Sequence, residues 1–192
     1  MRIETDRLII TDFDKEMAQV VHENSLDEDN RRFVPDEVFE TVDDALDAIE
    51  YLMSQYESED GPLVYPVLTK NGDNIGYVQL VPVEEGWEVG YHIAEKYTGN
   101  GYATEAVKAF LPYIAEKKAL QVIWGICLKE NSASVKVMEK CGFENVFIGE
   151  GVYQGEIREI VKNVWKSRIS YKEERLTADE YIDFLKRTDL GS

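Results

Sequence analysis

Tyr97-Thr98-Gly99-Asn100-Gly101-Tyr102-Ala103 is the stretch that says most about the fold, because it joins a predicted strand to a predicted helix. Glycine lets the backbone approach a ligand closely and adopt conformations that other residues avoid. The free N–H groups and the aligned dipole at a helix N-terminus favour an anion. Phosphate or pyrophosphate is therefore the natural ligand of such a turn. Spacing alone is equally typical of a tight turn that packs closely and binds nothing.

Two common phosphate-binding motifs do not fit this stretch. A P-loop needs a Lys directly after its last glycine, and Tyr102 stands there instead. A dinucleotide-binding fingerprint needs a third glycine and follows the first strand of its domain. Here Thr104 stands at the third position, and the stretch lies in the middle of the chain. Both motifs are therefore excluded.

The chain on either side of the turn alternates between strand and helix patterns. In residues 87–93 the side chains alternate, so that one face is apolar and the other carries Glu88, Gly90 and His92. Further strands are predicted at residues 7–11, 63–69, 75–81, 121–128, 143–153 and 157–169. Helices are predicted at residues 14–25, 41–55, from about 101, 131–141 and 177–187.

The motifs around the turn, taken together, resemble those of the GNAT acetyltransferases. The family's acetyl-CoA motif, (R/Q)-x-x-G-x-(G/A), corresponds to Thr98-Gly99-Asn100-Gly101-Tyr102-Ala103. The similarity covers about residues 4–165 and looks like the branch that contains ribosomal-protein-alanine acetyltransferases. The other matching segments are Glu4-Thr5-Asp6-Arg7-Leu8, Gly90-Tyr91, Asn131-Ser132-Ala133-Ser134 and Glu139-Lys140-Cys141-Gly142-Phe143.

The order of the predicted elements indicates a mixed α/β protein: antiparallel strands, then strand–helix–strand–helix, then a terminal hairpin. The resemblance implies a GNAT-like form of this class, with a mostly antiparallel, twisted sheet of about seven strands. About four helices would flank the sheet, and a C-terminal helix would follow it. Residues 1–170 are predicted to form one acetyltransferase domain, and residues 171–192 a helical extension.

The resemblance also implies where acetyl-CoA binds. The backbone at the end of strand 87–93 would lie near the thioester, and the glycine turn around the pyrophosphate. Asn131 would bond the pantetheine arm, although Asn is also a preferred helix N-cap, and both roles can hold together. Thr98 replaces the Gln or Arg that is usual in the family, so we expect weaker binding or compensation. The implied binding residues are Ile93, Ala94, Thr98, Gly99, Asn100, Gly101, Tyr102, Ala103 and Asn131; no metal is implied.

Direct transfer of an acetyl group to a primary amine needs a proton acceptor for the amine and a proton donor for the departing thiolate. Glu88 is the predicted base, because its strand face also carries His92; a solvated strand Glu is the alternative. Ser134 is the predicted acid, and a Ser that satisfies local backbone groups is the alternative. Many GNAT enzymes place a Tyr later in this helix, where this chain has Met138, which favours Ser134.

Charge excludes one large class of partner. The chain carries 21 Lys and Arg against 38 Asp and Glu, a net charge of −17, whereas a general nucleic-acid binder needs the opposite field. Its longest apolar runs fall short of the roughly 20 residues that cross a bilayer. Two cysteines, Cys127 and Cys141, fit a reducing compartment. We therefore expect a cytoplasmic monomer or homodimer without nucleic-acid or membrane partners.

Three hypotheses follow for the function. The resemblance favours acetylation of a protein N-terminal amine. The net charge favours a cationic small molecule, such as a polyamine or an aminoglycoside, although an acidic surface also serves solubility. Thr98 and Met138 leave a noncatalytic acyl-CoA-binding regulator open. The acceptor is expected against residues 14–55 and the terminal hairpin, where acidic residues form either a rim for a cation or ordinary solvated charges: Asp27, Glu28, Asp29, Asp36, Glu37, Asp43 and Asp44.

Overall fold

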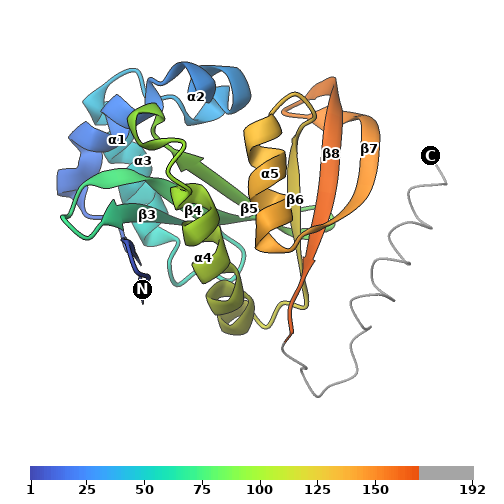
Figure 1. The fold of residues 1–192 in the computed structure, drawn as a ribbon. Helices are drawn as coiled ribbons and strands as arrows, with labels where there is room; N and C mark the ends of the chain where they lie inside the picture. Colours follow the sequence, from blue (N-terminus) through green and yellow to red (C-terminus); the bar gives the residue numbers. More distant parts are fainter. Residues whose placement is uncertain (169–192) are drawn as a thin grey trace.

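The computed structural model describes residues 1–168, and their strands form one mixed sheet (Figure 1). Its strand order is β1-β2-β3-β4-β5-β6-β8-β7, and all neighbours are antiparallel except β5 and β6, which are parallel. The strands are β1 (Arg2–Glu4), β2 (Leu8–Thr11), β3 (Leu63–Thr69), β4 (Asn74–Val83), β5 (Gly86–Ile93), β6 (Val122–Leu128), β7 (Glu144–Tyr153) and β8 (Glu156–Lys166).

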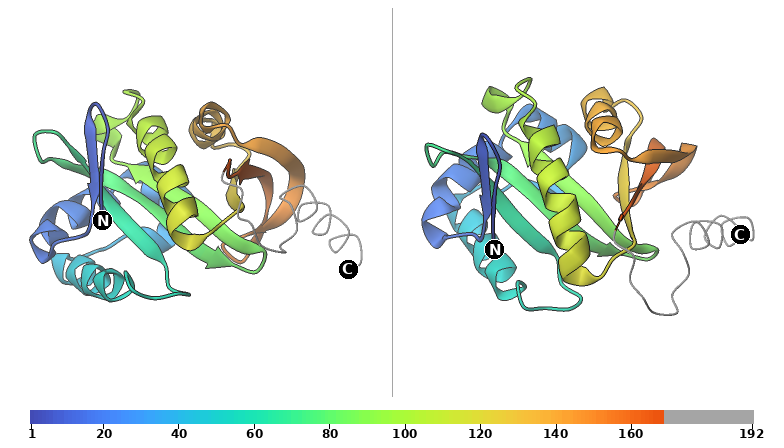
Figure 2. Two further views of the ribbon diagram at one scale, coloured as in Figure 1. Left: turned by 90° about the horizontal axis from the view of Figure 1, so that it is seen from below. Right: turned by 60° about the horizontal axis from the view of Figure 1, so that its bottom comes forward.

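Helices cover both faces of the sheet, with α4 on one face and α1 and α3 on the other (Figure 2). They are α1 (Ala18–Ser25), α2 (Glu28–Phe33), α3 (Val42–Ser54), α4 (Tyr102–Lys118) and α5 (Ser132–Cys141). Local signals set their ends. Thr41 and Asp44 form a reciprocal capping box at the start of α3, and Gly142, with φ of 85°, ends α5. None of the helices within residues 1–168 is long and apolar enough to span a membrane.

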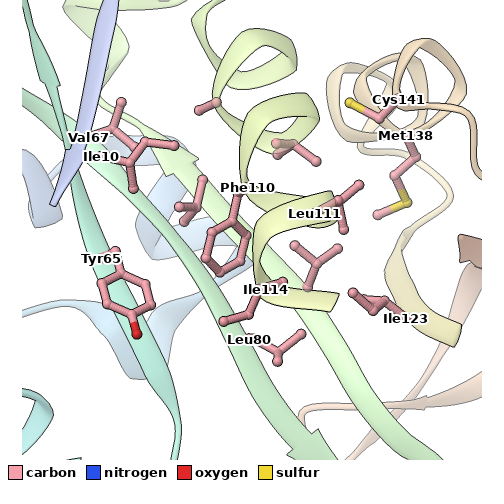
Figure 3. Packing of buried hydrophobic residues seen from close by; sticks show 14 of the residues in the cluster. Ile10, Tyr65, Val67, Leu80, Phe110, Leu111, Ile114, Ile123, Met138 and Cys141 are labelled. Carbon is pink, nitrogen blue, oxygen red and sulfur yellow. The ribbon is translucent and has the colours of Figure 1, made fainter. Parts of the chain in front are cut away.

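Strand β3 shows how a period of two builds the two layers. Tyr65 and Val67 are fully buried in the main core, while Val64 points to a second cluster formed with α1 and α3. Helix α4 contributes Phe110 to the main core, and its ring lies 5.9 Å from that of Tyr65 (Figure 3). Alternation along the strand therefore places one apolar face against each helical layer.

The predicted fold class is confirmed, with two elements more than expected. The sequence missed β1, which has three residues, two of them charged, and α2, whose six residues are mostly charged. Neither element carries an apolar period long enough to detect. The predicted helix 177–187 and the extension 171–192 lie outside the described residues, and the domain boundary at residue 170 stays a prediction.

Candidate active site

Strands β5 and β6 pair over a very short length. Glu88 and Trp124 form the single residue pair that joins them among the described strands. Beyond that pair the strands diverge, and the separation opens a cavity of about 630 Å³. Its walls come from β5 and β6, the first turn of α4, α5, the tip of the β7–β8 hairpin and the segment around α2.

The glycine turn forms one end of this cavity. Gly99 and Gly101 have φ angles of 76° and 78°, in the left-handed region that favours glycine. The first intrahelical bond of α4 runs from Glu105 N to Gly101 O, at 3.1 Å. The amide groups of Tyr102, Ala103 and the next residue therefore have no acceptor within the helix. They and the helix dipole suit a pyrophosphate.

Arg7 holds the turn from outside the cavity. Its guanidinium donates to the Asn100 carbonyl at 3.0 Å, lies over the Tyr102 ring and forms an ion pair with Glu105. A Cβ at Gly101 would lie 3.7 Å from Arg7 Nη2, so a cation stands beside the turn. Sequence analysis took Arg7 only as part of a motif, because nothing local shows that residue 7 meets residue 100.

The predicted binding residues fall into two groups. The Asn100 side chain donates to the carbonyls of Tyr97 and Thr98, both at 3.1 Å, and so shapes the turn. The Ala94 amide donates to Ile75 O in the sheet, at 2.9 Å. Neither Ala94 nor Asn100 is part of the cavity wall; the predicted residues that line it are Ile93, Thr98, Gly99, Gly101, Tyr102, Ala103 and Asn131.

The side chain of Thr98 makes a local hydrogen bond instead of the contact to pyrophosphate that the usual Gln or Arg is expected to make. Its hydroxyl donates to the Glu95 carbonyl at 2.9 Å and so caps the 3₁₀ helix η3 (Glu95–Tyr97). Arg7, whose Nη2 would lie 3.7 Å from a Cβ at Gly101, supplies a positive charge beside the turn. The expected weakening of acetyl-CoA binding stays a prediction.

Asn131 and Ser134 stand together at the start of α5. Asn131 Oδ1 accepts from Ser134 N at 3.0 Å, which confirms the N-cap role and leaves the Asn131 amide N–H groups for a ligand. The Ser134 hydroxyl lies 2.8 Å from Tyr91 Oη, which also donates to the Ser134 carbonyl at 3.1 Å. Sequence analysis missed Tyr91, because alternation placed it on the apolar face of β5.

Burial controls the acidity of this pair. It raises the pKa of Tyr91 well above its ordinary 10, although the hydrogen bond to Ser134 partly opposes the shift. A phenol with a pKa this far above its ordinary value stays protonated at neutral pH. Tyr91 therefore keeps its proton and can orient the Ser134 hydroxyl, but it is a poor source of a proton.

Glu88 lies across the point where β5 and β6 separate. Its Oε1 accepts from Ile126 N at 3.3 Å, and the carboxyl group lines the cavity. Burial raises the pKa of Glu88 from 4.5 to about 7, and the bond from Ile126 opposes this only in part. A carboxyl group that titrates near neutrality suits a general base.

A second buried carboxyl group, Glu37, lines the same cavity from the segment after α2. Burial raises the pKa of Glu37 to about 7, against a hydrogen bond from Gln79. Sequence analysis named Glu37 only as one charge of an acidic rim. Of that rim, Asp29 is the other member that lines the cavity, and no signal separates the two from their neighbours.

His92 also lines the cavity but is a weaker candidate for the base. Burial lowers the pKa of His92, and Asp27, whose Oδ2 lies 3.8 Å from Nε2, opposes the shift. The ring packs against Tyr77 with centroids 5.9 Å apart. This packing fits a structural role.

Comparison with known proteins identifies the family. Residues 7–144 match the model of the acetyltransferase (GNAT) domain. The chain belongs to the GNAT acetyltransferase family. The resemblance drawn from the glycine turn and its flanking motifs is thus confirmed, and the chain is an N-acetyltransferase that uses acetyl-CoA.

Named proteins stand near this GNAT enzyme in sequence and in fold. The uncharacterized N-acetyltransferase YnaD of Bacillus subtilis (strain 168) is 31% identical over 145 residues, 74% of this chain and 82% of the relative. A GNAT-family acetyltransferase from Bacillus anthracis superposes with a TM-score of 0.73 at 26% identity, covering 86% of this chain and 98% of the other. Ribosomal-protein-S5-alanine acetyltransferase from Vibrio fischeri reaches a TM-score of 0.76 at 16% identity, covering 88% and 97%.

The residues that line the cavity offer groups suited to binding acetyl-CoA and groups suited to moving protons. Acetyl-CoA supplies the activated acetyl group as a thioester. At one end, the backbone of the glycine turn and of α4 is arranged to hold the pyrophosphate. Elsewhere in the cavity wall, the carboxyl group of Glu88 can accept a proton, and the Ser134 hydroxyl can donate a hydrogen bond; their roles as base and acid stay predictions.

Proposed function

We propose that this acetyltransferase acts on the α-amino group at the N-terminus of a protein or peptide. The observation that carries the proposal is the position of the Glu88 carboxyl group in the cavity wall, next to the split between β5 and β6, where burial raises its pKa to about 7. An α-amino group has an ordinary pKa of about 7.7–8.0, whereas a lysine-like amine has about 10.4. A base of pKa near 7 takes a proton from the first at a cost of about 1 kcal/mol, and from the second at about 5 kcal/mol.

The rim of the cavity supports a peptide acceptor. Val152, Tyr153 and Gln154 from the hairpin tip line the cavity, and Tyr153 Oη donates to the Phe33 carbonyl across it. Val152 is 72% exposed, and Ile157, its partner on β8, is 74% exposed. Exposed apolar side chains beside a polar cavity suit the chain that follows an N-terminal residue.

A cationic small molecule is the second candidate, and the net charge of −17 is the observation that favours it. A negative field raises the local concentration of any cation. That field acts equally on a positively charged peptide, so charge alone does not prefer a polyamine or an aminoglycoside. We retain the cytoplasm as the expected compartment, since Cys127 and Cys141 are free thiols.

A panel of acceptors tests the proposal. Purified enzyme and acetyl-CoA are incubated with four kinds of acceptor. Two are peptides, one set with free N-termini and one set with formylated N-termini and an internal Lys; the others are a polyamine and an aminoglycoside. Mass spectrometry locates the added acetyl group. We expect acetylation of free α-amines, and little on Lys side chains or the polyamine. Acetylation confined to the small molecules would overturn the proposal and establish the second candidate.

A further inference from the structure

A second cavity, of about 220 Å³, lies next to the reaction cavity beneath α1 and α3. Its wall is mainly apolar and includes Val21, Phe39, Leu52 and Val64. Asn30, Glu37, Tyr77, Gln79 and His92 line both cavities, so the two spaces share a wall. The apolar cavity therefore lies directly beside the reaction cavity, with these five side chains at the boundary.

The shared wall holds two buried oxygen atoms that lack hydrogen-bond partners. Within residues 1–168, neither Glu37 Oε2 nor Asn30 Oδ1 has a partner. The orientation of Asn30, which is 1% exposed, is fixed because its Nδ2 donates to the carbonyls of Ser25 and Glu37, at 3.2 and 3.3 Å. Buried acceptors are normally paired, so these two call for a donor. A primary ammonium group supplies three N–H donors and the opposite charge.

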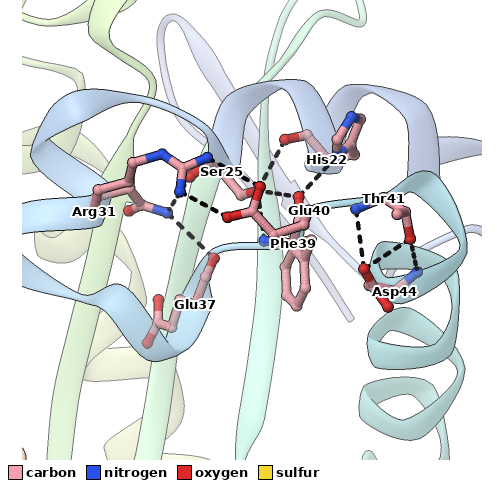
Figure 4. Close-up of polar contacts among 9 residues, drawn as sticks. His22, Ser25, Arg31, Glu37, Phe39, Glu40, Thr41 and Asp44 are labelled. Atoms are coloured by element: carbon pink, nitrogen blue, oxygen red, sulfur yellow. Dashed lines mark hydrogen bonds and ion pairs between the residues drawn. The ribbon is translucent and has the colours of Figure 1, made fainter.

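Neighbouring residues hold Glu37 in this position. Figure 4 shows its side chain extending away from the exposed ion pair of Arg31 with Glu40, so that pair does not neutralise it. Gln79 Nε2 donates to Glu37 Oε1 at 3.0 Å. Gln79 in turn lies flat over Gly90, where a Cβ would come within 2.5 Å of Nε2. The glycine before Tyr91 thus leaves room for the contact that orients Glu37.

We propose that Glu37 and Asn30 bind the amino group of the acceptor, and that the 220 Å³ cavity receives an apolar group carried next to that amine. The substrate class is therefore a primary amine with a compact apolar substituent. This deepens the proposed function: for a peptide acceptor, the substituent is the side chain of its first residue. Glu37 is a binding residue here, while Glu88 remains the candidate base.

Binding of simple amines tests this site without reference to acetylation. Isothermal titration measures the affinity of the CoA-saturated protein for methylamine, propylamine, isopentylamine and phenethylamine. We expect affinity to rise with apolar size, by about fourfold for each methylene group that is buried. Glu37→Gln should lower the affinity for every amine by at least about tenfold. Glu40→Gln, an exposed carboxylate of the same segment, is the matched control and should bind like the wild type.

A second pair of variants tests the cavity itself. Ala48 lines it from α3 and is half-buried, so Ala48→Phe fills the space from a helix surface. This change should abolish the dependence on apolar size and leave methylamine binding intact, whereas Asp47→Phe on the exposed side should change neither. The inference would be overturned if the affinity for amines did not depend on apolar size in the wild type, or if Glu37→Gln bound amines as tightly as the wild type. Amines that bind as expected while no peptide is acetylated would instead overturn the proposed function and leave this site standing.

Discussion

If Glu88 is the base, its environment sets the pH range of the reaction. Burial raises its pKa to about 7, and the base must be ionised to take a proton. The rate should therefore fall as the pH falls through about 7. We expect Glu88→Gln to lower kcat/KM by about 10²–10⁴-fold and to remove this acidic limb. Initial rates between pH 5.5 and 9 measure both effects.

The neighbouring hairpin turn offers a control for that experiment. Glu84 is exposed and four residues from Glu88, so Glu84→Gln removes one charge without entering the cavity. Its pH profile should match that of the wild type. An unchanged acidic limb in Glu88→Gln would instead place the base elsewhere, with Glu37 the next carboxyl group to test.

Ser134 and Tyr91 form a pair whose members should act as a unit. Hydrogen bonds to a charged group contribute about 1.5–3 kcal/mol, so Ser134→Ala should lower kcat by about 10–100-fold, with little change in KM for acetyl-CoA. Tyr91 acts through Ser134 at 2.8 Å. Tyr91→Phe should therefore have a smaller effect, and the double variant should be no slower than Ser134→Ala. Additive losses in this double-mutant cycle would mean that Tyr91 acts independently.

Single residues show the limits of prediction at this scale. Glu88 was predicted from strand alternation, since its face also carried Gly90 and His92. Glu37 and Tyr91 were not, because their importance depends on contacts with Gln79 and Ser134 that lie 42 and 43 residues away. A sequence shows which residues can carry charge, but the burial that shifts a pKa is a property of the folded chain.

The turn before α4 is the element on which acetyl-CoA binding depends most directly. Gly101 is its N-cap, in the left-handed conformation, beside helix amides that are free to bind an anion. Gly101→Asp adds bulk and negative charge where the pyrophosphate is expected. We predict that isothermal titration with acetyl-CoA detects binding by the wild type and none by this variant.

Gly72 provides the matched control for strain. It lies in the turn between β3 and β4 with φ of 94°, and a Cβ there meets nothing within 4 Å. Gly72→Asp therefore introduces the same residue type at a positive φ, far along the chain from the cavity. It should bind acetyl-CoA like the wild type, with circular dichroism showing both variants folded. Equal losses in the two variants would mean that backbone strain, and not the site, explains the effect.

Elements with strong periodic patterns were predicted closely, and the exceptions have a physical cause. β3 has the predicted limits, and α5 ends at the predicted Gly142. By contrast α2, Glu28–Phe33, is held by contacts from afar, including Arg32 with Glu130 at 3.2 Å. Short charged helices of this kind depend on tertiary contacts more than on intrinsic propensity. For this reason the sequence did not predict α2, which forms part of the cavity wall.

At the scale of the whole molecule, the sheet within residues 1–168 consists of two parts, and the single backbone pair Glu88–Trp124 joins them along β5 and β6. The segment around α2 spans the opening, through Tyr153 with Phe33 and Arg32 with Glu130. The split opens the cavity that both the glycine turn and the segment around α2 line. The carboxyl groups of Glu37 and Glu88 both lie in the wall of this cavity. Because burial there raises their pKa values, the cavity also makes the stability of the fold depend on pH.

Both buried carboxyl groups should make the fold less stable as the pH rises. Their pKa values are about 7 in the folded chain and near 4.5 when unfolded, so between these values the folded state holds protons that the unfolded state has lost. The free energy of unfolding is therefore highest below about pH 4.5 and falls as the pH rises from there to about 7. We expect the free energy of unfolding of Glu88→Gln, relative to the wild type, to rise by about 2–3 kcal/mol from pH 5 to pH 8. Urea unfolding at both values measures this difference, with Glu84→Gln as the control. Parallel pH dependences for all three proteins would mean that Glu88 ionises in the folded chain as easily as in water, and its assignment as a base near neutrality would then fail as well.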